Sequence, residues 1–543
     1  MLRLNELKLP LDHAPDALRA AIVAHLGLET CDLLSFSVAR RGFDARKRGA
    51  INFVYHLDLQ LRDEDAVLDR HAHDAKLIRT PDTSYRFVPR PSRPPAHRPV
   101  VIGAGPCGLL AGLVLAQMGL RPIILERGRI VRARTVDTFA FWRRAELTPE
   151  SNVQFGEGGA GTFSDGKLYS QISDPRHYGR KVLEEFVRAG APEEILFVSK
   201  PHVGTFRLVS MVESLRRSIE ALGGEYRFGS RVTAFHIETE GGRRRIQALG
   251  LQDGSVIETG HVVLAVGHSA RDSFEAIHAA GIAMHAKPFS IGVRIEHPQS
   301  LIDAARFGSD ARDPRLGAAD YKLVHHASNG RGVYSFCMCP GGTVVAAASE
   351  AGRVVTNGMS QYSRAERNAN AGIVVGLTPE DFRSHAGSFD PEGPLAGIGF
   401  QRHWEERAFA VGGSSYHAPA QRVGDFLAGR ASTGLGAVIP SYKPGVTPAD
   451  LAACLPDYVV TAIREALPQF DRRLRGFALE DAVLTGVETR TSSPLRIPRG
   501  DDGQSLNTAG LFPAGEGAGY AGGILSAGVD GIRAAEAIAR MMN

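Results

Sequence analysis

The chain has 543 residues, of which 43% are hydrophobic and 22% are charged. This composition supports a full hydrophobic core and excludes a fibrous or largely disordered protein. The 63 basic and 59 acidic residues leave a net charge of +4, which is too balanced to indicate a nucleic-acid binder by itself.

Residues 1–90 predict a separate α+β domain of ferredoxin-like type. Hydrophobic periodicity predicts a strand, a helix and two further strands, over residues 2–9, 15–26, 33–39 and 51–61. A basic run over residues 40–48 separates the last two strands. It could contact RNA or phosphate, but a solvated hairpin end is the simpler interpretation. Residues 91–97 are proline-rich and predict a stiff linker.

A βαβ unit follows the linker, with strands over residues 99–102 and 122–125 and a helix over 106–118. The turn between the first strand and the helix carries the spaced glycines of a dinucleotide-binding fingerprint, Gly103, Gly105 and Gly108. Such glycines permit a tight turn, close approach of backbone to a pyrophosphate, and close packing of helix on strand. The helix N-terminus supplies N–H donors and a positive dipole to the phosphates.

Glu126 ends the second strand, at the position where a carboxylate binds an adenosine ribose in this type of unit. Further along, residues 231–258 predict a β-meander, and residues 261–266 predict a strand buried on both faces. That strand ends at Gly267, where a second close approach of backbone to the cofactor is expected. The fingerprint is shared by FAD and NAD, so other segments must distinguish the two cofactors.

The residue composition of the chain changes twice after residue 287, at residues 288 and 485. Residues 288–484 are rich in Val-, Tyr- and Phe-containing strands with interspersed helices, and residues 485–543 return to a glycine-rich pattern. We therefore expect one discontinuous domain, made of residues 98–287 and 485–543, with a second domain inserted into it.

The segment before the last predicted helix contains Gly515, Glu516 and the turn Gly522–Ile524. It resembles the second flavin motif of FAD-dependent oxidoreductases of the glutathione-reductase-like superfamily. The resemblance implies that Glu516 contacts the ribityl or pyrophosphate region, and that Gly522, Gly523 and Ile524 set a helix N-terminus beside the flavin pyrimidine edge. The dipole of that helix would stabilise the negative charge that builds there on reduction.

Three further segments, residues 152–167, 267–272 and 485–494, are similar to those of bacterial FAD-dependent dehydrogenases. This resemblance implies an α/β fold: a discontinuous Rossmann-like FAD-binding domain of ββα type, with an inserted α+β substrate domain and the N-terminal α+β domain. It implies FAD as the cofactor and supplies no substrate.

The loop over residues 155–167 combines glycines with hydroxyl, carboxylate and ammonium groups. Thr162 and Ser164 could donate hydrogen bonds to phosphate or flavin carbonyls. Lys167 is a candidate catalytic residue that would stabilise reduced flavin or bind an anionic substrate; an ion pair with Asp165, or an ordinary mobile loop, are the alternatives. The full set of expected cofactor contacts is Gly103, Gly105, Pro106, Gly108, Glu126, Arg127, Gly158, Gly159, Gly161, Thr162, Ser164, Asp165, Val232, Gly267, Gly515, Glu516, Gly522, Gly523 and Ile524.

Other side chains are weaker candidates. His268 follows the Gly267 turn and is a second catalytic candidate, although a structural histidine explains it equally simply. Arg490 and Arg496 could clamp a carboxylate or phosphate of the substrate, with surface ion pairs as the alternative. Cys337 and Cys339 would lie on one face of a regular strand, about 6.6 Å apart, at the upper edge of disulfide reach. Small buried cysteines are therefore favoured over a redox dithiol.

Five scattered cysteines without metal-type spacing predict a reduced protein with no structural metal. The first residues do not form the apolar segment of a signal peptide, and no run of about 20 apolar residues predicts a membrane span. We expect a cytoplasmic protein. The patterns predict no oligomeric state.

We predict an FAD-dependent oxidoreductase that transfers hydride or electrons to or from an unidentified small molecule. A second GxGxxG unit is missing from the sequence, so NAD(P)H is expected to bind transiently as reductant, unless the substrate itself reduces the flavin. A flavin-dependent RNA-modifying protein that uses the basic run, and a flavoprotein in which FAD is structural or sensing, are the alternatives; nucleic acid is the less favoured partner.

Overall fold

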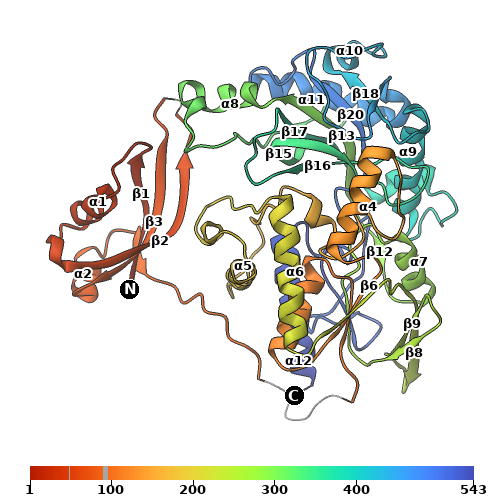
Figure 1. The fold of residues 1–543 in the computed structure, drawn as a ribbon, viewed down its shortest axis with the longest axis horizontal. Coiled ribbons are helices and arrows are strands. Elements are labelled where there is room, and N and C mark those ends of the chain that lie inside the picture. Colours follow the sequence, from red (N-terminus) through yellow and green to blue (C-terminus); the bar gives the residue numbers. More distant parts are fainter. Residues whose placement is uncertain (48, 90–95, 543) are drawn as a thin grey trace.

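A computed structural model describes residues 1–47, 49–89 and 96–542 (Figure 1). Most of the predicted linker, and Arg48 of the basic run, therefore lie outside the described residues. The chain forms three main units, each built around a β-sheet: an N-terminal antiparallel sheet, a parallel sheet and a large mixed sheet. The predicted fold class is confirmed. Within the described residues, no helix is long and apolar enough to cross a membrane.

The N-terminal unit has a βαββαβ order, which is the ferredoxin-like arrangement. Its sheet order is β2-β3-β1-β4, and every neighbouring pair is antiparallel. Leucines at alternate positions of β1 and β3 are buried, because successive side chains of a strand point to opposite faces. The elements are β1 (Leu2–Pro10), α1 (Ala17–Leu26), β2 (Leu33–Asp44), β3 (Asn52–Leu61), α2 (Glu64–Arg70) and β4 (Leu77–Arg79).

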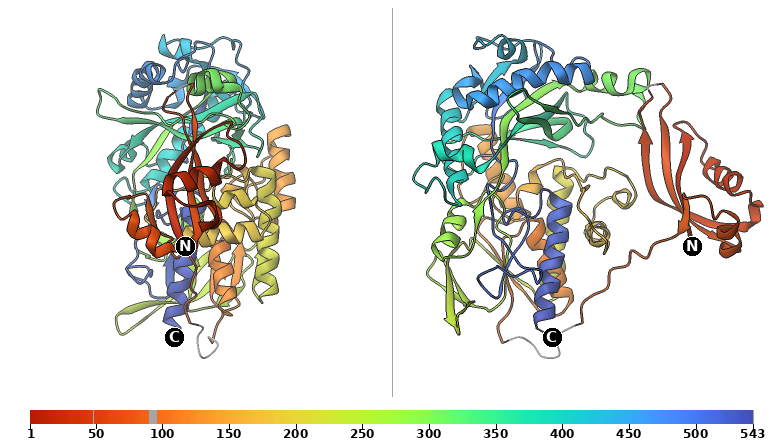
Figure 2. Two further views of the ribbon diagram at one scale, coloured as in Figure 1. Left: turned by 90° about the vertical axis from the view of Figure 1, so that its left-hand side faces the viewer. Right: turned by 180° about the vertical axis from the view of Figure 1, so that it is seen from behind.

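Strand β2 is longer than predicted and connects the N-terminal unit to the rest of the chain. Because β2 runs to Asp44 and not to residue 39, the first half of the basic run is in a strand, at the end of the β2–β3 hairpin. The backbone of Arg41 exchanges hydrogen bonds with Phe197 and Ser199, and Phe43 packs edge-on against Phe307. Figure 2 shows the unit standing to one side, with these strand tips reaching the other units.

The parallel sheet has the order β22-β11-β5-β6-β7, with helices on one face and an antiparallel meander on the other. Val101, Ile124 and Val263 pack toward the helices, whereas their neighbours in the same strands pack toward the meander. The elements are β5 (Val100–Ile102), α3 (Pro106–Gln117), β6 (Ile123–Glu126), α4 (Val131–Arg144), α5 (Tyr178–Arg188), α6 (Thr205–Ala221), β7 (Glu225–Phe228), β8 (Val232–Glu240), β9 (Arg243–Leu251), β10 (Val256–Glu258), β11 (Val262–Leu264), α7 (Arg271–Ala279), β22 (Leu511–Pro513) and α12 (Ile524–Met541). A parallel sheet covered on both faces is what such continuous apolar strands predict.

The mixed sheet has the order β14-β15-β17-β13-β20-β18-β19, with β16 paired to β15. Strand β20 continues past residue 484, so the sheet extends beyond the expected domain boundary at that position. The elements are β12 (His285–Ala286), β13 (Phe289–Pro298), α8 (Gln299–Phe307), β14 (Val324–His326), β15 (Gly332–Ala346), β16 (Thr356–Ser360), β17 (Asn368–Leu377), α9 (Ala396–Val411), β18 (Ala418–Arg422), α10 (Val423–Leu427), β19 (Val446–Pro448), α11 (Asp457–Arg473), β20 (Val483–Glu488) and β21 (Leu495–Arg496).

Candidate functional site

A cavity of about 1280 Å³ lies where the carboxyl ends of the parallel strands face the mixed sheet. The turns after β5, β6 and β11 form one wall, and β15, β16 and β20 contribute to the opposite wall. Ligand sites in open parallel sheets occur at this end of the strands. The volume exceeds the usual range of about 300–1,000 Å³ for a small-molecule pocket, so it can hold a large cofactor together with a second molecule.

The GxGxxG turn is fixed by close backbone contacts. A Cβ atom at Gly103 would lie 2.4 Å from the carbonyl oxygen of Ala265, and Gly103 has a φ of +101°. A Cβ atom at Gly108 would lie 1.8 Å from the carbonyl oxygen of Gly103. Gly105 differs, because its Cβ would meet only Gly159 Cα, at 3.6 Å, and the residue lines the cavity. Two glycines therefore shape the turn, and the third leaves bare backbone beside the cavity.

Glu126 ties this turn to two neighbouring segments. Its buried carboxylate accepts N–H hydrogen bonds from Ala104 at 2.9 Å, Gly128 at 2.8 Å and Gly156 at 3.0 Å. A carboxylate has about four lone-pair sites, so one site is left to accept a ribose hydroxyl from the cavity that Glu126 lines. The side chain thus organises the site as well as facing it.

The turn before α12 also presents bare backbone. A Cβ atom at Gly522 or Gly523 would meet no atom within 4 Å, and both residues line the cavity at the N-terminus of the helix. Nearby, His268 Nδ1 lies 3.5 Å from a carboxylate oxygen of Glu516. The other ring nitrogen of His268 is buried, and it has no hydrogen-bond partner among the described residues. That nitrogen is available to a bound ligand.

Arg134 anchors the loop over residues 152–167 from the protein interior. The sequence patterns did not identify this residue. The guanidinium of Arg134 is fully buried and donates to the carbonyl oxygens of Asn152, Val153, Gly156 and Glu157. Burial lowers the pKa of Arg134 to about 10, so it stays charged at neutral pH. The alternative of an ordinary mobile loop is wrong, because residues 151–158 are buried and anchored.

Most polar side chains of the loop over residues 152–167 form hydrogen bonds or ion pairs with other groups of the protein. Asp165 is buried and pairs with the guanidinium of Arg364, and the Ser164 hydroxyl donates to Gly161. The Lys167 ammonium donates to the carbonyl oxygen of Met338 and lies 3.8 Å from Asp165. Burial would lower the pKa of Lys167, but the nearby acidic groups, first Cys337 and then Cys339 and Asp165, raise it overall. Lys167 is therefore a permanent cation on the cavity wall.

Most of the predicted cofactor contacts line the cavity, and some do not. Those that line it are Gly103, Gly105, Pro106, Glu126, Arg127, Gly159, Gly161, Ser164, Asp165, Val232, Gly267, Glu516, Gly522, Gly523 and Ile524, together with Lys167 and His268. Gly108, Gly158, Thr162 and Gly515 lie outside the lining. Gly108 packs inside the turn, and Gly158 and Thr162 face helix α6 instead, so contact with the cofactor is not expected from these two.

Arg490 and Arg496 do not form the expected clamp. Arg490 lines the cavity, but its guanidinium donates to Glu405 at 3.1 and 3.2 Å and to the Ser349 hydroxyl at 2.7 Å. Arg496 lies outside the lining, where it donates to the Gly519 carbonyl and covers the Tyr520 ring. Their different partners leave no shared anion site.

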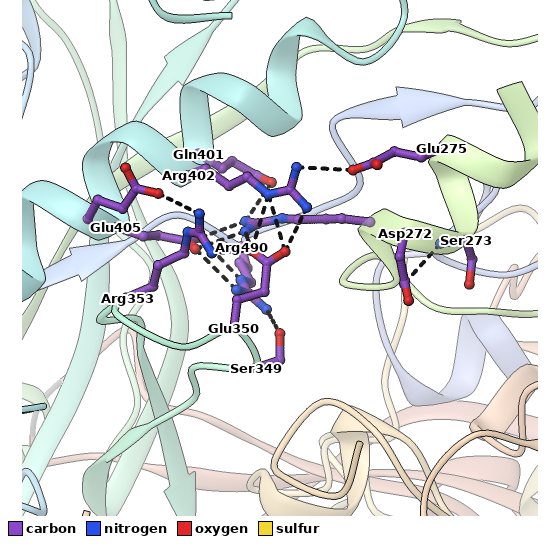
Figure 3. A network of polar contacts seen from close by, with 12 residues as sticks. Asp272, Ser273, Glu275, Ser349, Glu350, Arg353, Gln401, Arg402, Glu405 and Arg490 are labelled. Carbon is purple, nitrogen blue, oxygen red and sulfur yellow. Dashed lines mark hydrogen bonds and ion pairs between the residues drawn. The ribbon is translucent and has the colours of Figure 1, made fainter. Parts of the chain in front are cut away.

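Arg490 belongs to a cluster of buried ion pairs between the two larger units (Figure 3). Arg271, at the start of α7, pairs with Glu405 of α9 at 2.7 Å and with Glu350 at 2.5 Å. Arg402 also pairs with Glu350, at 2.7 Å. The two arginines Arg271 and Arg490 hold the pKa of Glu405 far below its usual range despite complete burial. The cluster therefore holds the cavity walls together with charges that are fully paired.

The wall on the mixed sheet was not predicted. Arg294 of β13 and Glu488 of β20 form a buried ion pair through two hydrogen bonds of 2.8 Å, and Glu488 lines the cavity. Beside this pair, β15 does not follow a regular strand at Cys337, which has a φ of +42°. The predicted parallel cysteines of a regular strand are therefore wrong, and Cys337 is not buried.

The residues of this cavity fit FAD. Bare backbone at Gly105, Gly267, Gly522 and Gly523 leaves space that side chains would fill, and His268, whose Nε2 atom has no partner among the described residues, lines the same cavity. The N-termini of α3 and α12 both open on it. Within the described residues, no group of three or more His, Cys, Asp or Glu side chains is placed to hold a metal ion.

Comparison with known proteins agrees with this cofactor. Residues 288–491 match a family described as FAD-dependent protein, C-terminal domain-like, and residues 1–60 match a domain of unknown function. Among solved structures, glycine oxidase from Geobacillus kaustophilus is 12% identical, with a TM-score of 0.34, over 82% of this chain and 95% of its own. L-proline dehydrogenase from P. horikoshii is 12% identical, with a TM-score of 0.32, over 83% and 93%. Scores this low carry no functional argument.

A relative from Clostridium beijerinckii, described as an uncharacterized protein, is 45% identical over 538 residues. The match covers 99% of this chain and 98% of the relative. With the match to the FAD-dependent model and the motifs around Gly103, Gly159 and Gly523, this similarity shows that the chain belongs to the family of bacterial FAD-dependent proteins that its sequence resembles.

Proposed function

We propose that the protein binds FAD in the cavity and acts as an FAD-dependent oxidoreductase on a small molecule held between the cofactor and the mixed sheet. The observation that carries this proposal is that one cavity has two unlike walls. One wall is bare backbone suited to a cofactor, and the other carries charged side chains suited to orienting a reactant. FAD, when bound, supplies hydride or electron transfer.

We assign the parts of the cofactor to residues of the backbone wall. The Gly103–Gly108 turn and the N-terminus of α3 would hold the pyrophosphate, where N–H donors and the helix dipole favour negative charge. Glu126 would accept a ribose hydroxyl. Gly522 and Gly523, at the start of α12, would face the pyrimidine edge. Each assignment uses residues that line the same cavity.

Lys167, at the end of the loop over residues 152–167, and His268, in the turn after β11, are the candidate residues nearest the chemistry. Because its pKa is raised, Lys167 remains an ammonium at neutral pH and would bind negative charge on a substrate or on the reduced cofactor, not abstract a proton. The free ring nitrogen of His268 can hold or accept a proton at a ligand atom. These roles are distinct, since Lys167 supplies a fixed charge and His268 supplies a ring nitrogen without a protein partner among the described residues.

The mouth of the cavity favours an anionic small molecule. Cations from three separate parts of the chain line it, namely Arg40, Lys200, Arg306, Lys322 and Arg473. Asp320 pairs with Lys200 and is the carboxylate in this group. Like charges around a concave opening raise the local concentration of oppositely charged ligands. NAD(P)H, which carries phosphates, is accordingly the reductant we propose to bind here transiently.

The contacts of the basic run over residues 40–48 do not favour the RNA-modifying alternative. The guanidinium of Arg41 lies over the rings of Phe53 and Phe197, and Arg46 pairs with Asp44. These contacts occupy much of the basic run within the protein. A gel shift with bulk tRNA tests this alternative directly.

The test is reconstitution with FAD followed by anaerobic screening of flavin absorbance. We expect the purified protein to bind FAD, and a member of a metabolite library, NADPH or NADH to bleach it. Failure to bind FAD would overturn the proposal. Bound FAD that no compound reduces, although dithionite does, would favour the structural or sensing alternative.

A further inference from the structure

We propose that Cys337 and Cys339 form a thiol–disulfide exchange site that opens on the cavity and acts on small disulfides. Cys337 is the attacking sulfur and Cys339 the resolving sulfur. The proposal goes beyond the proposed function, because the exchange uses side chains of this chain alone and needs no flavin.

The backbone at this site departs from a regular strand. Phe336 of β15 pairs with Gly372 of β17, and Cys339 pairs with Asn370, so two residues of β15 stand opposite one residue of β17. This is the arrangement of a β-bulge, a feature that re-aims side chains and is common beside active sites. Cys337 also has a positive φ, a conformation that strains a residue other than glycine. Surrounding contacts must therefore hold it there.

Three polar groups hold the bulge. The carbonyl oxygen of Cys337 accepts a hydrogen bond from Arg294 at 3.0 Å and from the Cys339 thiol at 3.3 Å. The carbonyl oxygen of Met338 accepts one from the Lys167 ammonium. Two cations thus donate to consecutive backbone carbonyls of the bulge, those of Cys337 and Met338. An inert core cysteine requires no such arrangement.

The two thiols differ in access and in charge. Cys337 is partly exposed and lines the cavity, whereas Cys339 is fully buried behind it. The hydrogen bond from Cys339, with the charges of Lys167 and Arg294, lowers the pKa of Cys337. The same contact, together with burial, raises the pKa of Cys339. An attacking cysteine is an accessible thiolate with a lowered pKa, and a resolving cysteine is a second thiol close to it. Cys337 has the properties of the first, and the buried, protonated Cys339 has those of the second.

The chemistry balances without another reactant. The Cys337 thiolate attacks a disulfide RSSR, forming a Cys337–S–S–R bond and releasing RS⁻. Cys339 then gives its proton to the released RS⁻ and attacks the Cys337 sulfur, which releases a second RS⁻ and closes a Cys337–Cys339 disulfide. The protein is oxidised by two electrons, and RSSR is reduced to two thiols. The Cys339 thiol lies 3.3 Å from the Cys337 carbonyl oxygen, so the bulge brings Cys339 back toward Cys337, whereas a regular strand would hold the two Cα atoms about 6.6 Å apart.

The test uses the full-length FAD-loaded protein and the disulfide DTNB, with peptide mass spectrometry. Cys31 is the internal reference, because it is exposed and lies beside Asp32, not beside a cation. We expect Cys337 to react at least tenfold faster than Cys31 at pH 6. We also expect release of two thionitrobenzoate ions from the pair and a linked Cys337–Cys339 peptide lighter by two hydrogens.

Variants separate the two roles. Cys339→Ser should release one thionitrobenzoate and retain a stable adduct on Cys337, whereas Cys337→Ser should leave the buried Cys339 unreactive. Lys167→Met should slow the first step about tenfold, because it removes a cation that stabilises the Cys337 thiolate. If either variant fails to fold, the wild-type peptide map still decides the question. A wild-type Cys337 that reacts no faster than Cys31, or that keeps its adduct without forming the disulfide, would overturn the proposal.

Discussion

The two walls of the cavity are built on opposite principles. On the parallel-sheet wall, the decisive residues are glycines, and the contacts are made by backbone: Gly103, Gly108 and Gly159 each leave no room for a Cβ atom. On the mixed-sheet wall, the decisive residues are charged side chains buried in pairs, such as Arg294 with Glu488 and Arg490 with Glu405. The first wall is specified by space, and the second by charge balance.

This difference predicts how substitutions in each wall affect the protein. Adding one methyl group to the backbone wall disrupts geometry and leaves charge untouched. Removing one charge from the other wall leaves its partner buried and unpaired, which costs about 3–5 kcal/mol, although the intact pair contributes little net stability. Buried ion pairs between units are therefore better explained as devices that fix relative position than as a source of stability.

The largest effect is expected for Glu405→Gln. This change leaves Arg271 and Arg490 buried beside a neutral amide, so we expect a loss of about 3–5 kcal/mol in the free energy of unfolding. Thermal and denaturant unfolding at pH 7 measure it. The exposed Glu406 of the same helix, whose partner is Arg353 in the turn between β15 and β16, is the matched control, and Glu406→Gln should change stability by less than about 1 kcal/mol. Equal effects would contradict the charge-balance account.

On the backbone wall, Gly108→Ala should be the most damaging change. Its Cβ would lie 1.8 Å from the Gly103 carbonyl oxygen, so the turn must open, at a cost of about 1–3 kcal/mol. FAD binding should be lost with it. Gly522→Ala is the control, because its Cβ would meet no atom within 4 Å and should leave the apoprotein's stability within about 0.5 kcal/mol. In that variant we expect only weaker FAD binding by fluorescence titration. An unchanged FAD affinity in both variants would mean that the cofactor does not bind at these turns.

Acid should weaken the charged wall selectively. Arg271 and its neighbours lower the pKa of Glu350 to about 2 despite burial, compared with an ordinary value of 4.5. A lowered folded-state pKa means that the stabilisation is fully present above about pH 4.5 and is lost as pH falls toward 2, by at most about 1.4 kcal/mol per pH unit. The stability gap between wild type and Glu350→Gln should therefore shrink between pH 5 and pH 3 in urea unfolding. A gap that is constant or widens would contradict the pairing.

The sequence predicted the backbone wall well because its signals are local. The GxGxxG turn, Glu126 and the start of α12 each follow from spacings of a few residues within one strand–turn–helix unit. Glycine spacing reports directly where the backbone must come close to something. The same reasoning located the N-terminal sheet, whose strands alternate cleanly, although it missed β4 and ended β2 too early.

The charged wall could not be predicted, because its partners are distant in sequence. Arg294 and Glu488 are 194 residues apart, and Arg271 and Glu405 are 134 apart. Nothing in either local sequence marks an arginine as buried, since burial of a charge depends on the partner that arrives with the fold. The bulge at Cys337 is similar: it depends on pairing with β17 and on Lys167 and Arg294, which are remote from it in the chain.

A smaller effect is expected at the start of α12. Gly523 has an extended backbone that valine adopts without strain, and a Cβ there would enter the cavity. Gly523→Val should displace the cofactor from the helix N-terminus, whose dipole favours the reduced state by about 0.3–1 kcal/mol. The two-electron midpoint potential should therefore shift negative by about 6–20 mV. Potentiometry on a variant that still binds FAD is the measurement, and a positive or zero shift would place the pyrimidine edge elsewhere.

The smallest predicted effect tests whether the charge principle extends to the mouth of the cavity, where the N-terminal unit contributes Arg40. A partly exposed cation in water contributes about 0.2–1 kcal/mol to attraction, so Arg40→Ala should slow flavin reduction by NADPH about 1.5- to 5-fold at low ionic strength. The difference should fade as salt rises, because the screening length is about 10 Å at 0.1 M and about 3 Å at 1 M. Arg46→Ala is the matched control: Arg46 lies just beyond β2, is paired with Asp44 and lies outside the cavity lining. If both variants slow the reaction equally, or if the Arg40→Ala effect persists at high salt, the N-terminal unit does not act on substrate through charge, and its contact through Arg41 and Phe43 would be purely structural.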